Sequence, residues 1–426
     1  MSVGVKRILS LFTIFIMLGM CFLAAYRGDQ GDNLFAAPVE DITIWYTDSS
    51  LTDFLNSAAL SIRDEENIRV NVVLYEDMSY MEAIYEASVK GEDFPDLFIV
   101  ETSNLEEAVK MGIAHPASHN EDSVLTDEHF PNVALSAVTY HGTYFGYPFY
   151  YDTAYLLYNA TYLAQMAAEN GLSGVDLVPA TIEDLKNFAD LYSTPEGVEN
   201  FFAWDASDIF YNYFFAGYYF NVGGPSGDDS EIIEVYNEDA VACLKVYQEL
   251  NQFFSFDSKE HTMEHVMEDF VAGKIVYTIA TADALKKIET ATFNEEFPYS
   301  YGIATLPGID SEHPAKGLSV TDCAVINGFS EHKEAANTFA SYLTTTASNT
   351  LYSRTGKLPC VNADASNLME VPPLVRSCYL SSATLPKLVE LENFWMQLEL
   401  TFNKIWDGED PDVILKELAE LISEEM

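Results

Sequence analysis

Runs of apolar residues alternate with amphipathic stretches over the first third of the chain, and this alternation predicts strands and helices in turn. Short β-rich runs predict strands at 42–46, 70–75 and 96–100. Helices are predicted at 51–64, at 80–89 and over a stretch that ends near Gly112. Strands that alternate with helices in this order predict an α/β fold with a mainly parallel sheet covered on both faces.

Polar residues follow two of these predicted strands. Thr47 and Asp48 come after the first strand, and Glu101, Ser103 and Asn104 come after the third. Ligands of parallel sheets bind at the carboxyl ends of the strands, so we expect these side chains to face one crevice. Capping of the next helix explains Asp48 equally well.

The N-terminal segment is typical of an exported protein. Lys6 and Arg7 precede an apolar run at 8–26, which is the pattern of a secretory signal and is also long enough for an uncleaved membrane anchor. The Leu-Gly-Met-Cys sequence that ends at Cys21 resembles a bacterial lipobox, whose cysteine carries a lipid after cleavage. Residues 1–37 are therefore predicted to be a signal peptide or lipoprotein anchor and a tether, and to hold the protein at the outer face of the cell membrane.

Composition and charge exclude several classes of function. Hydrophobic residues make up 48% of the 426 residues and aromatic residues 13%, which excludes a disordered chain. The formal net charge is −46, which disfavours binding of nucleic acid or of an anionic membrane surface. The five cysteines are widely spaced without a C-x-x-C pair, which argues against a disulfide framework or a thiolate zinc site.

A set of short motifs occurs along the chain in a defined order. The motifs are 95–98 (PDLF), 144–149 (YFGYPF), 155–159 (YLLYN), 181–185 (TIEDL), 270–274 (FVAGK), 301–307 (YGIATLP) and 356–359 (GKLP). Together they resemble the bacterial extracellular solute-binding proteins related to maltose-binding protein, over about residues 40–426. The order of the motifs makes the resemblance specific.

The resemblance implies a two-lobed α/β fold of the type II periplasmic-binding-protein class, with a ligand cleft between the lobes. It divides the chain into lobe 1 at 38–150 plus 323–369, and lobe 2 at 151–322 plus 370–426. Turn residues near Gly317 suit a hinge. The implied function is the substrate-binding component of an ABC importer, which passes a carbohydrate, an oligosaccharide, to permease subunits in the membrane. We expect a monomer without cofactor or enzymatic activity.

Thirteen residues match the family's ligand contacts or their surroundings. They are Thr47, Asp48, Glu101, Ser103, Asn104, Tyr151, Asp152, Trp204, Asp205, Tyr211, Thr281, Asp283 and Trp395. Carboxylates and amides suit the hydroxyls of a sugar, and aromatic rings suit its apolar faces. Hinge hydrogen bonds are the alternative role of Tyr151 and Asp152, and helix packing is the alternative role of Trp395. Family members place an aromatic residue near the position of Val100, and maltose binders place one near Asp283, so the sugar is expected to differ.

Residues 201–220 are unusually aromatic. Eleven of these twenty residues are Phe, Tyr or Trp. For most of them the pattern favours a buried helix whose rings fill a core. Trp204, Asp205 and Tyr211 are the members expected to reach a ligand, because the family places contacts near the start of this segment.

Three other functions stay open. His261, Glu264 and His265 form an H-x-x-E-H sequence, which on a helix resembles an inverted zinc-protease motif, although a solvated helix face is the simpler interpretation. Asp205 and Asp208 could be paired as in a glycosidase, but among 67 carboxylates such a pair is expected by chance. A peptide or polyamine binder is the remaining alternative, and the acidic composition suits a polyamine.

Overall fold

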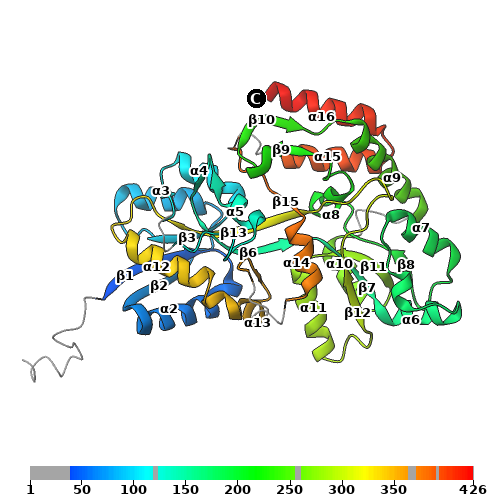
Figure 1. Ribbon diagram of the computed structural model, residues 1–426, viewed down its shortest axis with the longest axis horizontal. Coiled ribbons are helices and arrows are strands. Elements are labelled where there is room, and N and C mark those ends of the chain that lie inside the picture. The colour runs from blue at the N-terminus through cyan, green and yellow to red at the C-terminus, as the bar shows by residue number, and fades with distance from the viewer. Residues whose placement is uncertain (1–38, 119–122, 255–260, 363–370, 390–392, 426) are drawn as a thin grey trace, which may run out of the picture.

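The computed structural model describes residues 39–118, 123–254, 261–362, 371–389 and 393–425. Cys21 and the predicted anchor therefore lie outside the described residues. Two groups of elements, lobe 1 on the left and lobe 2 on the right of Figure 1, are each built on a sheet of their own. None of the helices in the described part of the chain is both long enough and apolar enough to cross a membrane.

The sheet of lobe 1 has the strand order β14-β6-β13-β3-β1-β2, and β15 pairs with β13. Its strands are β1 (Glu40–Tyr46), β2 (Ile68–Leu74), β3 (Leu97–Glu101), β6 (Tyr147–Thr153), β13 (Leu318–Ile326), β14 (Leu358–Pro359) and β15 (Ala383–Thr384). The pairs β1–β2 and β1–β3 are parallel, whereas β13 runs antiparallel to β3 and β6. The predicted parallel arrangement is thus confirmed for the first three strands only.

Helices cover both faces of this sheet. The helices of lobe 1 are α2 (Thr52–Glu66), α3 (Tyr80–Lys90), α4 (Leu105–Lys110), α5 (Asn132–Ala137), α12 (Lys333–Thr344) and α13 (Leu351–Thr355). Leu97 and Ile99 of β3 pack in one core cluster with α2 and α12. Phe98 and Val100 point to the other face and pack with α3 and α4. A strand buried on both faces accounts for the continuous apolar run in the sequence.

Lobe 2 is built on a smaller sheet with the order β12-β7-β11-β8. These strands are β7 (Tyr155–Asn159), β8 (Asn200–Phe202), β11 (Ile275–Ala280) and β12 (Tyr301–Ala304). The helices are α6 (Ala160–Glu169), α7 (Ile182–Leu191), α8 (Ile209–Asn212), α9 (Glu238–Phe254), α10 (Met263–Val271), α11 (Ala282–Phe293), α15 (Phe394–Trp406) and α16 (Pro411–Glu425). Two hairpins complete the molecule: β4 (Thr139–Tyr140) with β5 (Thr143–Tyr144) in lobe 1, and β9 (Asn221–Gly223) with β10 (Asp229–Glu234) beside α16.

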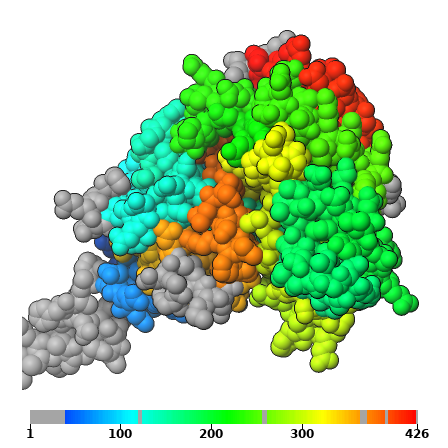
Figure 2. Space-filling view, turned by 45° about the vertical axis from the view of Figure 1, so that its right-hand side comes forward, coloured from blue at the N-terminus to red at the C-terminus, as the bar shows by residue number. Residues whose placement is uncertain are grey.

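The chain passes between the lobes at their junction more than once. The first passage is at Ala154, between the end of β6 and the start of β7. The second is at Gly317, directly before β13. Later α14 (Pro373–Leu380) lies at the surface between the lobes, and Figures 1 and 2 show it there. Several connectors that lie together are the arrangement that lets two rigid bodies rotate about a common hinge.

The early strands and helices predicted from the sequence are confirmed, with ends that differ by a few residues. A capping box at the start of α7 is also present: Asp184 N donates to Thr181 Oγ1 (3.0 Å), and Thr181 N donates to Asp184 Oδ2 (2.9 Å).

The prediction of one long helix in the aromatic segment at 201–220 is wrong. This segment contains β8, the four-residue α8 and a short 3₁₀ turn at Tyr213–Phe215. Its rings do fill a core as predicted, because Phe202, Trp204 and Phe215 are fully buried. Burial of this many rings does not require a helix, since a compact irregular segment packs them from several directions.

Candidate functional site

Three cavities are lined by residues that the sequence predicts as ligand contacts. We call them the lobe-1 cavity (520 Å³, lined by Thr47, Tyr80, Glu101, Asn104 and Asp322 among others), the lobe-2 cavity (520 Å³, lined by Tyr211, Glu264, Thr281, Asp283 and Lys287 among others) and the bridging cavity (250 Å³). The bridging cavity is lined by Ser103, Asn104, Glu107, Pro386, Leu388, Val389 and Trp395. Eight of the thirteen residues predicted from the sequence line one of these cavities: Thr47, Glu101, Ser103, Asn104, Tyr211, Thr281, Asp283 and Trp395.

The lobe-1 cavity lies where β1 and β3 end. These strands are parallel neighbours, so Thr47 after β1 and Asn104 after β3 reach one site, as the sequence predicted. Asp322 of β13 joins them, because it stands opposite Glu101 in the antiparallel register. Burial raises the pKa of Asp322 to about 7, and the charge of Glu101 adds to this effect. Burial also raises the pKa of Glu101, whose carboxylate accepts a hydrogen bond from Ser103 Oγ.

An ion pair stands beside this cavity. Lys357 Nζ lies 3.0 Å from Asp48 Oδ2 and 5.6 Å from the ring centroid of Tyr150. Burial lowers the pKa of Lys357, but the hydrogen bond and charge of Asp48 outweigh burial, and the net shift is upward. Burial works to raise the pKa of Asp48, but hydrogen bonds from Ser50 and Lys357 lower it overall. Asp48 Oδ1 also accepts from Ser50 N (2.9 Å), so this side chain does cap the following turn.

The lobe-2 cavity lies at the start of α11. Thr281 is the residue before this helix, and Asp283 is in its first turn. Asp152 reaches the same helix start from β6, and its Oδ1 atom accepts from Ala282 N (2.9 Å). Burial raises the pKa of Asp152 to about 6. Tyr211 is 8% exposed and also lines this cavity. Asp152 thus holds lobe 1 against a helix that lines the cavity on lobe 2.

The bridging cavity brings an indole ring from lobe 2 close to polar side chains of lobe 1. Trp395 lies in the first turn of α15. Its ring packs edge-on against the ring of Phe394, with 5.1 Å between the ring centroids. Ser103 and Asn104, in the turn that precedes α4, line the same cavity. An aromatic surface and an amide across a small gap can hold a ligand that has an apolar face and a hydroxylated edge.

Three of the predicted ligand contacts have structural roles. Trp204 is fully buried and its Nε1 donates to Asn212 Oδ1 (2.8 Å). Asp205 accepts from Met263 N (2.9 Å) at the start of α10 and from Ser207 Oγ (2.6 Å). Tyr151 is 1% exposed and stacks on Tyr379 with a centroid distance of 3.7 Å. In this structure their side chains serve the packing of lobe 2 and of the hinge.

Two residues at the site were missed from the sequence. Asp322 is the one charged residue of β13, and a charged residue inside a largely buried strand was a usable signal. Lys357 belongs to the GKLP motif, and its pairing with Asp48 depends on a contact between distant parts of the chain that no local pattern reveals.

The H-x-x-E-H sequence does not form the predicted helical motif. α10 begins only at Met263 after Thr262 as N-cap, so His261 precedes the helix and does not share a helix face with His265. In the described part of the chain, no group of three or more His, Cys, Asp or Glu side chains is placed to hold a metal ion. Glu264 instead lines the lobe-2 cavity.

Known proteins resemble this chain in sequence and in fold. The family model described as bacterial extracellular solute-binding protein matches residues 61–373. A maltotriose-binding protein from Pyrococcus abyssi (strain GE5 / Orsay) is 25% identical over 170 residues, which are 38% of this chain and 34% of the relative. The match therefore spans about a third of the length of this curated relative.

Solved structures share the architecture over nearly the whole chain. A cyclo/maltodextrin-binding protein complexed with maltotetraose has a TM-score of 0.75 at 20% identity, over 92% of this chain and 98% of that chain. An extracellular solute-binding protein from Staphylococcus aureus in complex with maltose has a TM-score of 0.75 at 19% identity, over 91% of this chain and 98% of that chain. These similarities confirm the predicted two-lobed fold.

Proposed function

Because the chain belongs to the bacterial extracellular solute-binding proteins, we propose that it captures a neutral oligosaccharide between its lobes and delivers it to the permease of an ABC importer. As a member of this family it is an exported binding protein and not an enzyme. Similar proteins that bind maltotriose and maltotetraose support an oligosaccharide as the solute.

The observation that carries the proposal is the pairing of unlike surfaces across the gap. Trp395 from lobe 2 lines the bridging cavity together with Ser103 and Asn104 from lobe 1. A pyranose ring presents apolar C–H groups on its face and hydroxyls on its edge, so it needs an aromatic ring and polar side chains together. The lobe-1 cavity shares Asn104 and Glu107 with the bridging cavity, so the two together provide room for more than one sugar unit.

Capture requires no bond to be broken. We propose that the solute first binds one lobe and that rotation about the connectors at Ala154 and Gly317 brings the other lobe over it. Closure is then a shift of population toward a state in which both lobes contact the solute. The ligand contacts in this proposal are the eight predicted residues that line the three cavities. Asp48 positions Lys357, and Asp152 positions the start of α11.

The remaining parts of the assignment concern the whole chain. We propose that the exported protein is a monomer held at the outer face of the cell membrane through Cys21 or an uncleaved N-terminal helix, as the basic residues and the apolar run support. The sheets support a division into lobe 1 at 38–150 plus 323–369 and lobe 2 at 151–322 plus 370–426, with β6 and β13 extending lobe 1 to Thr153 and from Leu318.

Isothermal titration calorimetry with maltotriose, maltotetraose and spermidine tests the proposal. Saturable heat with either oligosaccharide, and none with spermidine, is the expected result. Spermidine is included because Glu101, Asp322, Asp283 and Glu264 line the cavities and carboxylates favour a cationic solute. Binding of spermidine alone would replace the oligosaccharide by a polyamine, which was the alternative that the acidic composition left open.

A further inference from the structure

A fourth cavity, which we call the hinge cavity, lies at the junction of the lobes and has a volume of 580 Å³. Its walls come from α5 of lobe 1, from the segment at 213–225 of lobe 2, and from the connectors at Lys316 and Ser382–Pro386. Among the described residues, none of the thirteen predicted ligand contacts lines it. The volume is in the range of small-molecule sites.

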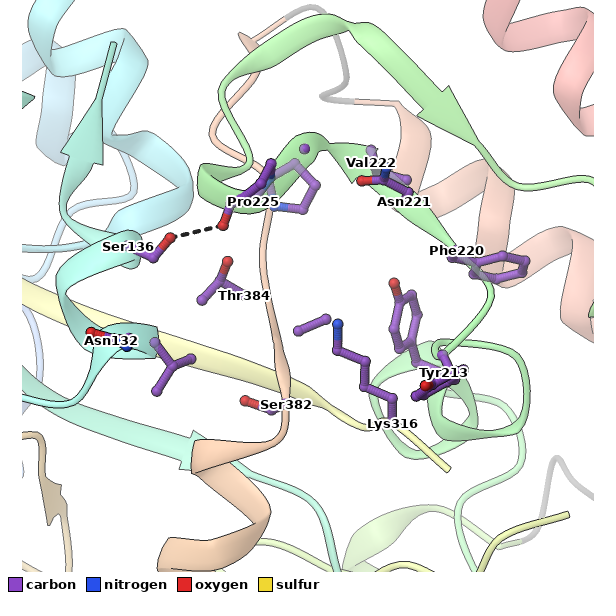
Figure 3. A pocket seen from close by; sticks show the side chains of 15 residues that line it. Asn132, Ser136, Tyr213, Phe220, Asn221, Val222, Pro225, Lys316, Ser382 and Thr384 are labelled. Carbon is purple, nitrogen blue, oxygen red and sulfur yellow. Dashed lines mark hydrogen bonds between the residues drawn. The ribbon is translucent and has the colours of Figure 1, made fainter. Parts of the chain in front are cut away.

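The hinge cavity contains one cationic side chain. Figure 3 shows the amine end of Lys316 pointing into the space between Thr384, Pro225 and Asn221. No carboxylate of the described residues lies within ion-pair distance of Lys316, and no acidic residue is among those that line the cavity. Burial lowers the pKa of Lys316, which is the opposite of what a neighbouring carboxylate does. A half-buried ammonium without a counter-charge is unusual in a chain with a net charge of −46.

A second lysine nearby makes the contrast plain. Lys387 is fully buried, and its ammonium donates to the carbonyl oxygens of Ser136 (3.1 Å) and Ser226, so its hydrogen bonds are made within the protein. Lys387 is thus a structural link between α5 and the turn before β10, whereas the amine of Lys316 faces the cavity. The two lysines lie beside the same junction but only one of them is directed at a ligand-sized space.

The rest of the wall combines polar residues, which are Asn132, Ser136, Asn221, Ser382 and Thr384, with apolar and aromatic ones. Tyr213, Phe220, Val222 and Pro225 lie around the amine of Lys316. Tyr213 is held against the backbone of Lys316 because residue 217 is glycine: a Cβ there would lie 2.3 Å from the Tyr213 ring and 2.4 Å from the Lys316 carbonyl oxygen. The aromatic and apolar part of this wall favours a flat apolar body, and the amine favours one negative charge beside it.

From this arrangement we propose that the hinge cavity binds a small monocarboxylate with an aromatic body, and that its occupancy changes the affinity for the transported solute. A single ammonium balances a single negative charge, and the acidic chain repels anions of higher charge such as phosphate. The walls belong to both lobes and to the connectors, so a molecule in the cavity favours the arrangement of the lobes that it fits. The coupling rests on the proposed function, whereas the binding does not.

The test uses naphthalene-2-carboxylate as the probe and naphthalene-2-methanol as its uncharged analogue. Isothermal titration calorimetry is done without sugar on the wild-type protein, on Lys316→Met and on Lys416→Met, an exposed lysine of α16 far along the chain that serves as the matched control. We expect the carboxylate to bind the wild type and the control equally, and to bind Lys316→Met roughly tenfold or more weakly, because a charge-assisted hydrogen bond is lost. The uncharged alcohol should bind all three proteins about as weakly as the carboxylate binds Lys316→Met.

Two results would overturn the site: no saturable binding of the carboxylate at millimolar concentration, or equal binding to the wild type and Lys316→Met. The coupling is measured separately by titrating maltotetraose with and without saturating probe. A change in the sugar affinity of the wild type that is absent in Lys316→Met supports coupling, and an unchanged affinity contradicts it. The probe titration contains no sugar, so it tests binding at the hinge cavity even if the protein binds no oligosaccharide.

Discussion

The two lobes equip their facing surfaces differently. Lobe 1 presents polar and acidic side chains at the ends of strands, with Glu101 and Asp322 in register on neighbouring strands. Lobe 2 presents the aromatic residues Trp395 and Tyr211 together with charged residues of both signs, such as Asp283 and Lys287. Rigid strand ends fix hydrogen-bonding groups accurately, whereas rings offer broad surface that tolerates variation in the ligand. If the proposed function is correct, we expect lobe 1 to orient the solute and lobe 2 to supply most of the contact area.

The largest effect on sugar affinity is expected when the indole of Trp395 is removed from lobe 2. Trp395→Ala is expected to weaken maltotetraose binding roughly 30- to 150-fold, which corresponds to about 2–3 kcal/mol of lost burial and stacking. Calorimetry measures the change. The control is Trp45→Ala on lobe 1, which removes a ring stacked on Tyr75 at 5.2 Å and outside the three cavities. If both variants lose the same affinity, the indole has no special role in binding.

Removal of the ion pair between Lys357 and Asp48 tests what stabilises the acidic residues of lobe 1. Lys357→Met leaves Asp48 without its partner beside Glu101 and Asp322, so the free energy of unfolding should fall by about 2 kcal/mol. Urea unfolding followed by circular dichroism measures this. The matched variant is Lys90→Met, which breaks an exposed pair with Glu86 and should change the free energy of unfolding much less, because water screens an exposed pair. Equal losses would show that Lys357 is an ordinary surface lysine.

The pH dependence of stability follows from the raised pKa of Asp322. This carboxyl has a pKa of about 7 in the folded protein and an ordinary value of 3.8, so the folded state binds its proton more tightly. Stability is therefore lost as the pH rises from about 4 to about 7. Asp322→Asn should reduce the loss between pH 5 and pH 8 by about 1–2 kcal/mol, as measured by urea unfolding at each pH. Part of the slope should persist through Asp152, whose pKa is about 6. An unchanged slope in the variant would contradict the assignment.

The smallest effect is expected at the phenol of lobe 2. Tyr211→Phe keeps the ring and removes one hydroxyl that faces Thr281, so affinity for maltotetraose should fall only threefold to about tenfold. Calorimetry at a single pH suffices. Tyr211→Ala, which also removes the ring, should lose considerably more. If the two variants are equally weak, the hydroxyl and not the ring is the important part of Tyr211.

The polar residues that follow the first strands were predicted well, because the apolar strand and the polar turn after it are adjacent in the sequence. Thr47 directly follows β1, Asn104 ends the short turn after β3, and parallel pairing of β1 and β3 brings them together. The prediction failed for Trp204, which sequence position placed at the ligand but packing places in the core. Whether a ring faces a gap or a core depends on contacts with distant helices, and no run of neighbouring residues records that.

The hinge region was predicted only in outline. A turn near Gly317 suggested a connector, and β13 does begin one residue later. The roles of Asp322 and Lys357 escaped prediction, because the first depends on a register with β3 and the second on a contact with the turn after β1. Both contacts join segments that are far apart in sequence, so they appear only once the chain is folded.

The position of β13 has a consequence for how the chain comes to be folded. This strand separates β3 from β6 in the larger sheet, yet it is made only after most of lobe 2, and β14 follows it at Leu358–Pro359. A chain emerging from the ribosome therefore cannot complete its first sheet until synthesis is nearly finished. Pairing over such long distances in sequence also folds slowly. We therefore expect export of the chain in an unfolded state, with the larger sheet completed after the membrane has been crossed.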